Sequence, residues 1–163
     1  MVHFHQNMGE MNEKIGEVVQ VTNSQLTFMK TLAYKSIDLE ARSRRNNLIF
    51  RGFVENVGEN CLNLLQDFLR NRLGIYTENI YIARVHRLCK RNPRRHHQMR
   101  PVIANFRDFS DIELIMANER QLKSTPFSID YHYPLEIQEA RSRLWPRYKE
   151  LKRTMPRSKV QIV

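Results

Sequence analysis

The residues of this chain with the clearest chemistry are basic side chains concentrated in one short stretch, residues 84–100. That stretch reads RVHRLCKRNPRRHHQMR and contains no acidic residue. So many positive charges repel one another, and a polyanion such as a phosphate backbone would offset that repulsion. We therefore expect this stretch to bind nucleic acid, the alternative being a solvated loop whose charge only aids solubility. Its candidate binding residues are Arg84, Arg87, Lys90, Arg91, Arg94, Arg95 and Arg100.

The charge of the whole chain points the same way. Its 163 residues carry a formal net charge of +10, with a pI near 10.0. Within residues 1–40, five acidic residues outnumber three lysines, so the positive excess lies entirely after Glu40. This asymmetry suggests a first segment for self-association and a second for a polyanion. No apolar run is as long as a membrane span and no lipidation signal is evident, so we expect no membrane partner.

Catalysis, metal binding and cofactors find little support. Cys61 and Cys89 lack metal-ligand spacing and indicate reduced thiols in an intracellular protein. The histidines at positions 3, 5, 96 and 97 do not provide the four convergent ligands of a closed zinc site. No paired carboxylates, glycine-rich phosphate loop or activated nucleophile is recognisable. We expect no enzyme activity and no cofactor, and His86 is more simply a surface or core histidine than a general base.

The elements that would position the basic residues begin with a heptad pattern in residues 8–42, which contain no proline. The pattern predicts a coiled coil over about four to five heptads, with Gly16 costing about 1 kcal/mol of helix stability. An amphipathic helix packed on its own domain is the alternative, and the mixed seam leaves dimer and trimer open. The predicted oligomerisation residues are Met8, Met11, Ile15, Val18, Met29, Leu32 and Leu39, with Thr22, Gln25 and Ser36 as polar seam positions.

After a hinge at residues 43–47, period-two and helical patterns alternate along the chain. They predict strands at 48–53, 80–85, 101–106 and 127–131, a helix at 59–73 with Gly74 as its C-cap, and a second helix capped by Ser110 or Asp111. Right-handed crossovers fold this order into a four-stranded antiparallel sheet with both helices on one face. The predicted fold class is α+β: a coiled-coil helix (1–42), an RNA-recognition-motif-like βαββαβ domain (43–132) and a partial C-terminal domain (133–163).

The open face of such a sheet is where RNA-recognition-motif domains hold single strands, commonly by stacking bases on aromatic side chains. Here Ile49, Val102 and Ala104 stand where stacking aromatics are expected, and we assign Phe50 and Phe106 to the core. We therefore expect arginine and lysine contacts to phosphate to provide most of the affinity. That mode predicts weak sequence preference and steep salt dependence.

Residues 133–153 predict a basic helix with Pro134 at its first position and a kink or restart at Pro146. We expect Leu144, Tyr148 and Leu151 to pack while the basic side chains face outward. The segment 158–163 has the pattern of a strand without a partner, so this unit is expected to be incomplete.

The chain resembles a known family, the first open-reading-frame proteins of LINE-class non-LTR retrotransposons. The matching pieces occur in family order from about Arg42 to the end. They are RRNNLIFRGFVE (44–55), IYIARVHRL (80–88), RPVIANFRDFSDIELIMANERQL (100–122) and YPLEIQEARSRLWPRYKELKR (133–153). Asn105 is a departure, because some members carry an arginine there. Members also continue for tens of residues further, which implies a fragment or a decayed copy.

The resemblance implies a homotrimer that coats its own transcript, binds single-stranded RNA and acts as a nucleic-acid chaperone. It implies a cytoplasmic ribonucleoprotein, with the nucleus as a second compartment. By the same resemblance the RNA-contacting residues are Arg44, Arg45, Arg84, Arg87, Arg94, Arg95, Arg120, Arg141 and Arg143. Single-stranded DNA stays open as a ligand. The rival interpretation is a coiled-coil scaffold whose basic domain binds an acidic protein.

Overall fold

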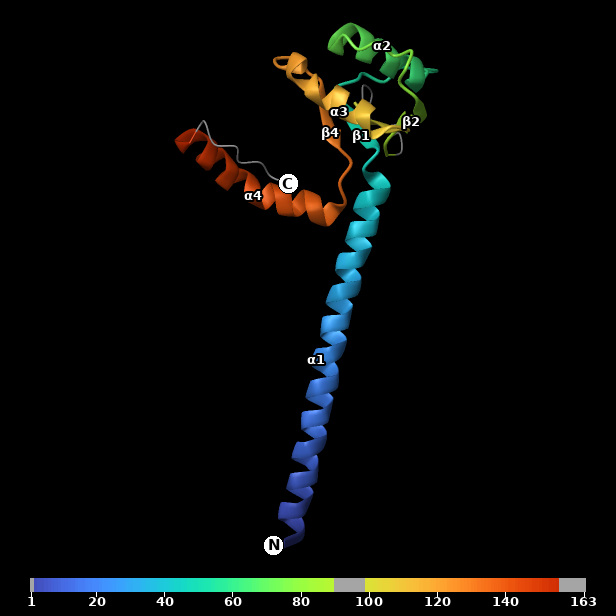
Figure 1. Ribbon diagram of the computed structural model, residues 1–163. Coiled ribbons are helices and arrows are strands. Elements are labelled where there is room, and N and C mark those ends of the chain that lie inside the picture. The colour runs from blue at the N-terminus through green and yellow to red at the C-terminus, as the bar shows by residue number, and fades with distance from the viewer. Residues whose placement is uncertain (1, 90–98, 156–163) are drawn as a thin grey trace. The chain divides into compact units, whose positions relative to one another are not determined.

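The computed structural model describes the backbone of residues 2–89 and 99–155 and the side chains from residue 8 onward (Figure 1). The chain divides into two compact units, residues 1–40 and residues 41–163. The fold class is α+β, as predicted: a long N-terminal helix, a four-stranded antiparallel sheet and further helices. None of the helices described has both the length and the apolar character needed to cross a lipid bilayer.

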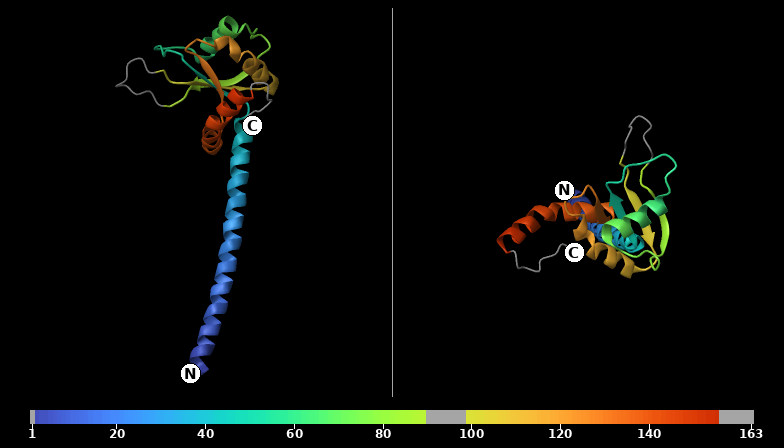
Figure 2. Two further views of the ribbon diagram at one scale, coloured as in Figure 1. Left: turned by 90° about the vertical axis from the view of Figure 1, so that its left-hand side faces the viewer. Right: turned by 90° about the horizontal axis from the view of Figure 1, so that it is seen from above.

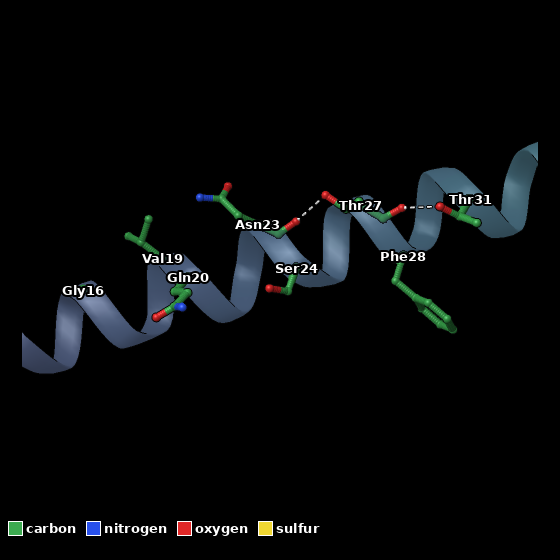
Figure 3. Close-up of a pocket in the computed structure, with 8 residues that line it drawn as sticks. All are labelled: Gly16, Val19, Gln20, Asn23, Ser24, Thr27, Phe28 and Thr31. Carbon is green, nitrogen blue, oxygen red and sulfur yellow. Dashed lines mark hydrogen bonds between the residues drawn. The ribbon is translucent and has the colours of Figure 1, made fainter.

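The N-terminal segment forms one continuous helix, α1 (Val2–Arg44), as its lack of proline and its heptad pattern predicted. Its large apolar side chains from Met8 to Leu39 are exposed apart from the half-buried Ile37, and all seven predicted oligomerisation residues are among the exposed ones. The hydroxyl groups of Thr27 and Thr31 donate to backbone carbonyls four residues earlier, which leaves these polar residues compatible with the helix. Figure 3 shows the part of α1 between Gly16 and Thr31, where the side chains of Val19 and Phe28 project from the helix.

The sheet has the strand order β2-β3-β1-β4, and every pair is antiparallel. The predicted element order is therefore confirmed, and α2 and α3 cover the same side of the sheet (Figure 2). The second strand runs further than predicted, to Arg87, after a register shift between Ile82 and Arg84. The elements are β1 (Asn47–Arg51), α2 (Cys61–Leu73), β2 (Ile82–Arg87), β3 (Val102–Phe106), α3 (Phe109–Ala117), the 3₁₀ helix η1 (Glu119–Leu122) and β4 (Ser128–Tyr131).

The core lies between the sheet and the helices α2 and α3. Phe50 of β1 contacts Phe68 of α2 edge-on and lies beside Phe106 of β3, which confirms the core assignment of Phe50 and Phe106. Val102 and Ala104 also face this core, so they do not occupy the outer positions expected of them. Because side chains alternate along a strand, residues 102, 104 and 106 must share one face, and Ile103 and Asn105 take the other.

Local backbone geometry explains the ends of the elements. Gly74 adopts a left-handed conformation at φ 62° and caps α2 as predicted, and Asn60 caps the N-terminus of α2. The helix α3 begins earlier than predicted, because the extended backbone of Asp108 makes it the N-cap in place of Ser110 or Asp111. Gly52 ends β1 at φ +95°, with a hypothetical Cβ only 2.4 Å from the carbonyl oxygen of Pro126.

The last described element is α4 (Leu135–Thr154), for which Pro134 is the N-cap and not the first helical residue. The helix continues through Pro146, so of the kink or restart predicted there the restart does not occur, and the kink stays a prediction. Leu144 is exposed, against its predicted packing, whereas Tyr148 and Leu151 are half-buried. The strand predicted at 158–163 lies outside the described residues.

Candidate nucleic-acid interface

The face of the sheet opposite α2 and α3 carries polar and basic side chains in cross-strand register. Arg84 of β2 pairs with Asn105 of β3, which in turn pairs with Asn47 of β1. Beside this row, Ile103 is nearly buried and forms an apolar floor. These side chains line a groove of about 440 Å³, the sheet-face groove. Its lining residues are Ser43, Asn47, Arg84, His86, Leu88, Ile103, Asn105 and His132.

A hydrogen-bonded network organises one wall of the sheet-face groove. Arg44 Nη1 lies 3.0 Å from His132 Nε2 and 3.5 Å from the carbonyl oxygen of Tyr133. Asn47 Nδ2 lies 3.2 Å from the other ring nitrogen of His132, and Asn105 donates to Asn47 Oδ1 at 2.7 Å. Because a guanidinium group can only donate, His132 Nε2 is the acceptor in its contact with Arg44. The network holds the positive charge of Arg44 at the side of the groove.

The structure gives Arg87 a different role from the one predicted for it. Its side chain is only 4% exposed, and its Nε and Nη2 donate to the two carboxylate oxygens of Glu59 at 2.6 and 2.8 Å. Its Nη1 donates to the carbonyl oxygens of Phe53 and Arg100, and its Nη2 also donates to that of Val54. A guanidinium group buried in this way stabilises the fold and does not offer its donors to a phosphate.

Arg100 is likewise held by hydrogen bonds, although it is only half-buried. Its Nε and Nη2 donate to the carboxylate of Glu55 at 2.8 and 2.7 Å, and Nη1 donates to the carbonyl of Cys89. The hydrogen bond from Arg87 lowers the pKa of Glu59, against the opposing effect of burial. The hydrogen bond with Glu55 raises the pKa of Arg100. Both arginines thus join the segment before α2 to the ends of the basic stretch.

A second hollow lies along the β4 edge of the sheet, bounded by the first half of α4; its volume is about 450 Å³, and it is called the edge cleft below. Gln138 of α4 donates to the carbonyl of Tyr133 at 2.7 Å, and the guanidinium carbon of Arg141 lies 4.8 Å from the centre of the Tyr133 ring. The cleft's lining residues are Ile49, Arg51, Met116, Glu119, Ile129, Asp130, Tyr131, Tyr133, Gln138, Arg141 and Trp145.

The edge cleft contains both acidic and basic side chains, and one of the acids is already paired. Asp130 accepts from Arg51 Nε at 2.9 Å, so this acid is already neutralised in part. Burial raises the pKa of Glu119, and the neighbouring Asp130 raises it further. Burial also raises the pKa of the Tyr131 hydroxyl. The cation of Arg141 therefore lies over an aromatic ring in a cleft that also contains two acids, of which Asp130 is paired with Arg51.

The predicted basic residues fall into separate groups. Arg84 lines the sheet-face groove, Arg44 contacts the groove residue His132 without lining the groove, and Arg141 lines the edge cleft. Arg45 and Arg120 are exposed but line neither hollow, and Arg143 is exposed at 3.8 Å from Glu139. Lys90, Arg91, Arg94 and Arg95 lie outside the described residues, so their roles stay predictions.

Sequence reasoning missed the aromatic residues Tyr133 and Trp145 of the edge cleft. A usable signal existed, because Trp145 and Tyr148 are three residues apart and each has a lysine four residues later. Within residues 2–89 and 99–155, no group of three or more histidine, cysteine, aspartate or glutamate side chains could hold a metal ion. The comparisons add no relative, since neither a protein-family model nor a curated protein matches this chain.

Proposed function

We propose that the chain binds single-stranded nucleic acid, with RNA as the ligand. The observation that carries the proposal is the sheet-face groove, whose lining contains Arg84, two histidines and two asparagine amides but, among the described residues, no acidic side chain. Amides and imidazoles hydrogen-bond to bases and sugars, and arginine binds phosphate, often in bidentate fashion. The βαββαβ order with one face open to a ligand resembles the RNA-recognition motif.

The groove favours contacts to the backbone over stacking on the sheet. The apolar floor of the groove consists of Ile103 and Leu88. The described residues that line the groove include no phenylalanine, tyrosine or tryptophan on which a base could stack. Arg44 adds a second cation held in place by His132. Binding through such groups depends on the release of counterions and weakens as salt rises.

We also propose that α1 joins copies of the chain. Its exposed seam residues would be buried between helices, and a dissolved monomer would leave them in water. Together with the sequence resemblance, this supports an RNA-coating protein of a LINE-type retrotransposon that acts as a homotrimer. Several weak grooves in one oligomer would then add through avidity along one strand.

The test is binding of the full chain to a fluorescently labelled single-stranded RNA, measured by anisotropy across a salt series with duplex RNA as competitor. We expect binding that favours the single strand and weakens steeply with salt. Arg84→Gln should weaken binding to all sequences and reduce the salt slope by about 0.7, the value for one lost phosphate contact on a single strand. Lys123→Gln removes the same charge from an exposed residue that lines neither hollow, and its slope should be unchanged.

The second candidate is a scaffold in which α1 is the working part and the basic domain binds an acidic protein. An acidic polypeptide of matched charge, used as competitor, separates the two functions. Equal competition by the polypeptide and by unlabelled RNA, with no preference for the single strand, would favour the scaffold.

A further inference from the structure

The helix α4 carries a stacked pair of aromatic rings on its surface. The ring centres of Trp145 and Tyr148 lie 5.2 Å apart, with their planes inclined by 22°. A spacing of three residues places the two side chains next to each other on one face of a helix. Trp145 keeps 49% of its surface exposed, although an indole of this size usually buries most of its area in a protein core.

Amines accompany this pair at a regular interval. Lys149 Nζ lies 5.6 Å from the centre of the Trp145 ring, and Lys152 Nζ lies 5.9 Å from that of the Tyr148 ring. Each lysine follows its aromatic partner by four residues, the spacing that brings side chains together on a helix. The ammonium groups gain from the electron-rich ring faces and keep that face of the helix positively charged.

The aromatic surface continues into the edge cleft. Trp145 lines the cleft together with Tyr131 and Tyr133, whose ring centres are 5.6 Å apart. The guanidinium group of Arg141 lies over the Tyr133 ring. The four rings Tyr131, Tyr133, Trp145 and Tyr148 form what is called the aromatic ladder below, and every cation-to-ring contact on it comes from α4.

This combination of groups selects one kind of occupant. An apolar protein surface would have to cover the ammonium groups of Lys149 and Lys152, and it offers no acid that would compensate for their lost hydration. A nucleobase is flat and stacks on an exposed aromatic ring, and the phosphates on either side of it match the lysines. Proteins that bind single strands without sequence preference combine these two contacts, and the stacking is available to every base because each has a π face.

We propose that the aromatic ladder stacks the bases of a single strand, with Trp145 and Tyr148 as the stacking residues and Lys149 and Lys152 holding the adjoining phosphates. The inference rests on the proposed function and adds a base-stacking subsite that the sheet-face groove lacks. It also revises the expectation that phosphate contacts provide most of the affinity. Loss of one stacked base should weaken binding by roughly 5-fold to 100-fold.

Tryptophan fluorescence reports directly on the proposed subsite, because Trp145 is the only tryptophan of the chain. The full chain is titrated with an RNA oligonucleotide of about 12 nucleotides, a length within the usual site size of single-strand-binding proteins. A second titration uses an abasic oligonucleotide of the same length and charge. Tryptophan emission is recorded beside anisotropy. We expect the RNA to quench the emission, and the abasic strand to bind roughly tenfold more weakly without quenching it.

Variants separate stacking from structure. Trp145→Leu should weaken RNA binding by about tenfold and leave abasic binding unchanged, whereas Trp145→Phe should retain most of the affinity. Leu144→Ala is the matched control, because its side chain is equally exposed on α4 and lies outside the aromatic ladder. Equal affinity for RNA and abasic strand with unchanged emission overturns the stacking subsite and leaves the proposed function standing. No binding of either strand by the folded chain at low salt overturns both.

Discussion

A substitution at Arg87 tests whether this arginine stabilises the fold or binds RNA. Replacing it with methionine keeps much of the side-chain volume but removes every contact of the guanidinium group. The Glu59 carboxylate and the carbonyl oxygens of Phe53, Val54 and Arg100 would lose a donor at a site where Arg87 is 4% exposed. Removing one partner of a buried ion pair costs about 3–5 kcal/mol. That is a large part of the roughly 5–15 kcal/mol that stabilises a domain.

The measurement is urea unfolding followed by NMR signals of core methyl groups such as those of Leu69 and Ile115, which report on the sheet domain and not on α1. With a denaturant slope of about 1.5 kcal/mol per molar urea, the unfolding midpoint should fall by about 2–3 M. Arg45→Met is the control, since it removes an exposed arginine and should leave the midpoint nearly unchanged.

RNA binding by the same variant separates the two roles of an arginine. Under conditions where Arg87→Met is folded, its salt slope should equal that of the wild type, because no phosphate contact is lost. An unchanged urea midpoint together with a slope reduced by about 0.7 would refute the reasoning and restore Arg87 to the RNA-contacting set.

Three further predictions follow from the structure. Glu59→Gln should lower the free energy of unfolding by its full amount above pH 4.5. This deficit should vanish as the pH falls below 4.5, because the folded-state pKa of Glu59 is lowered and its carboxylate stabilises the fold only while it is ionised. Urea midpoints measured as a function of pH check this. Gly52→Ala should cost at least about 3 kcal/mol, more than Gly58→Ala, which has a similar positive φ but open space around its Cβ; comparable unfolding midpoints would contradict it. Leu32→Asp should reduce self-association in analytical ultracentrifugation, whereas Tyr34→Asp, off the heptad seam, should not.

Much of the fold could be predicted because local signals along the chain agreed with one another. Leu65, Phe68, Leu69 and Leu73 recur at helical spacing and are buried, and Gly74 ends their helix as its position predicted. The four strands appeared as short apolar runs in the right order. Their boundaries were less accurate, because a register shift near Ile82 and a cap at Asp108 depend on the neighbouring strand and the local backbone.

The candidate site was less predictable than the fold. A basic side chain near a predicted loop gives no indication of whether an acid lies opposite it. Arg84 and Arg87 are three residues apart on one strand, yet the first lines a groove and the second is enclosed by Glu59 from a segment 28 residues earlier. Alternation along β2 and the course of the segment before α2 decide between them.

By itself, the sequence determined the charge asymmetry, the uninterrupted N-terminal helix and the order of helices and strands. These properties depend on residue types and on spacings of two, three or four residues, which act within one element. Only the tertiary structure decided which arginines line a hollow and which form ion pairs with Glu55 and Glu59. It alone also brought aromatic rings of β4, α4 and the segment between them into one cleft. Contacts between distant segments depend on packing, so no local pattern could have assigned them.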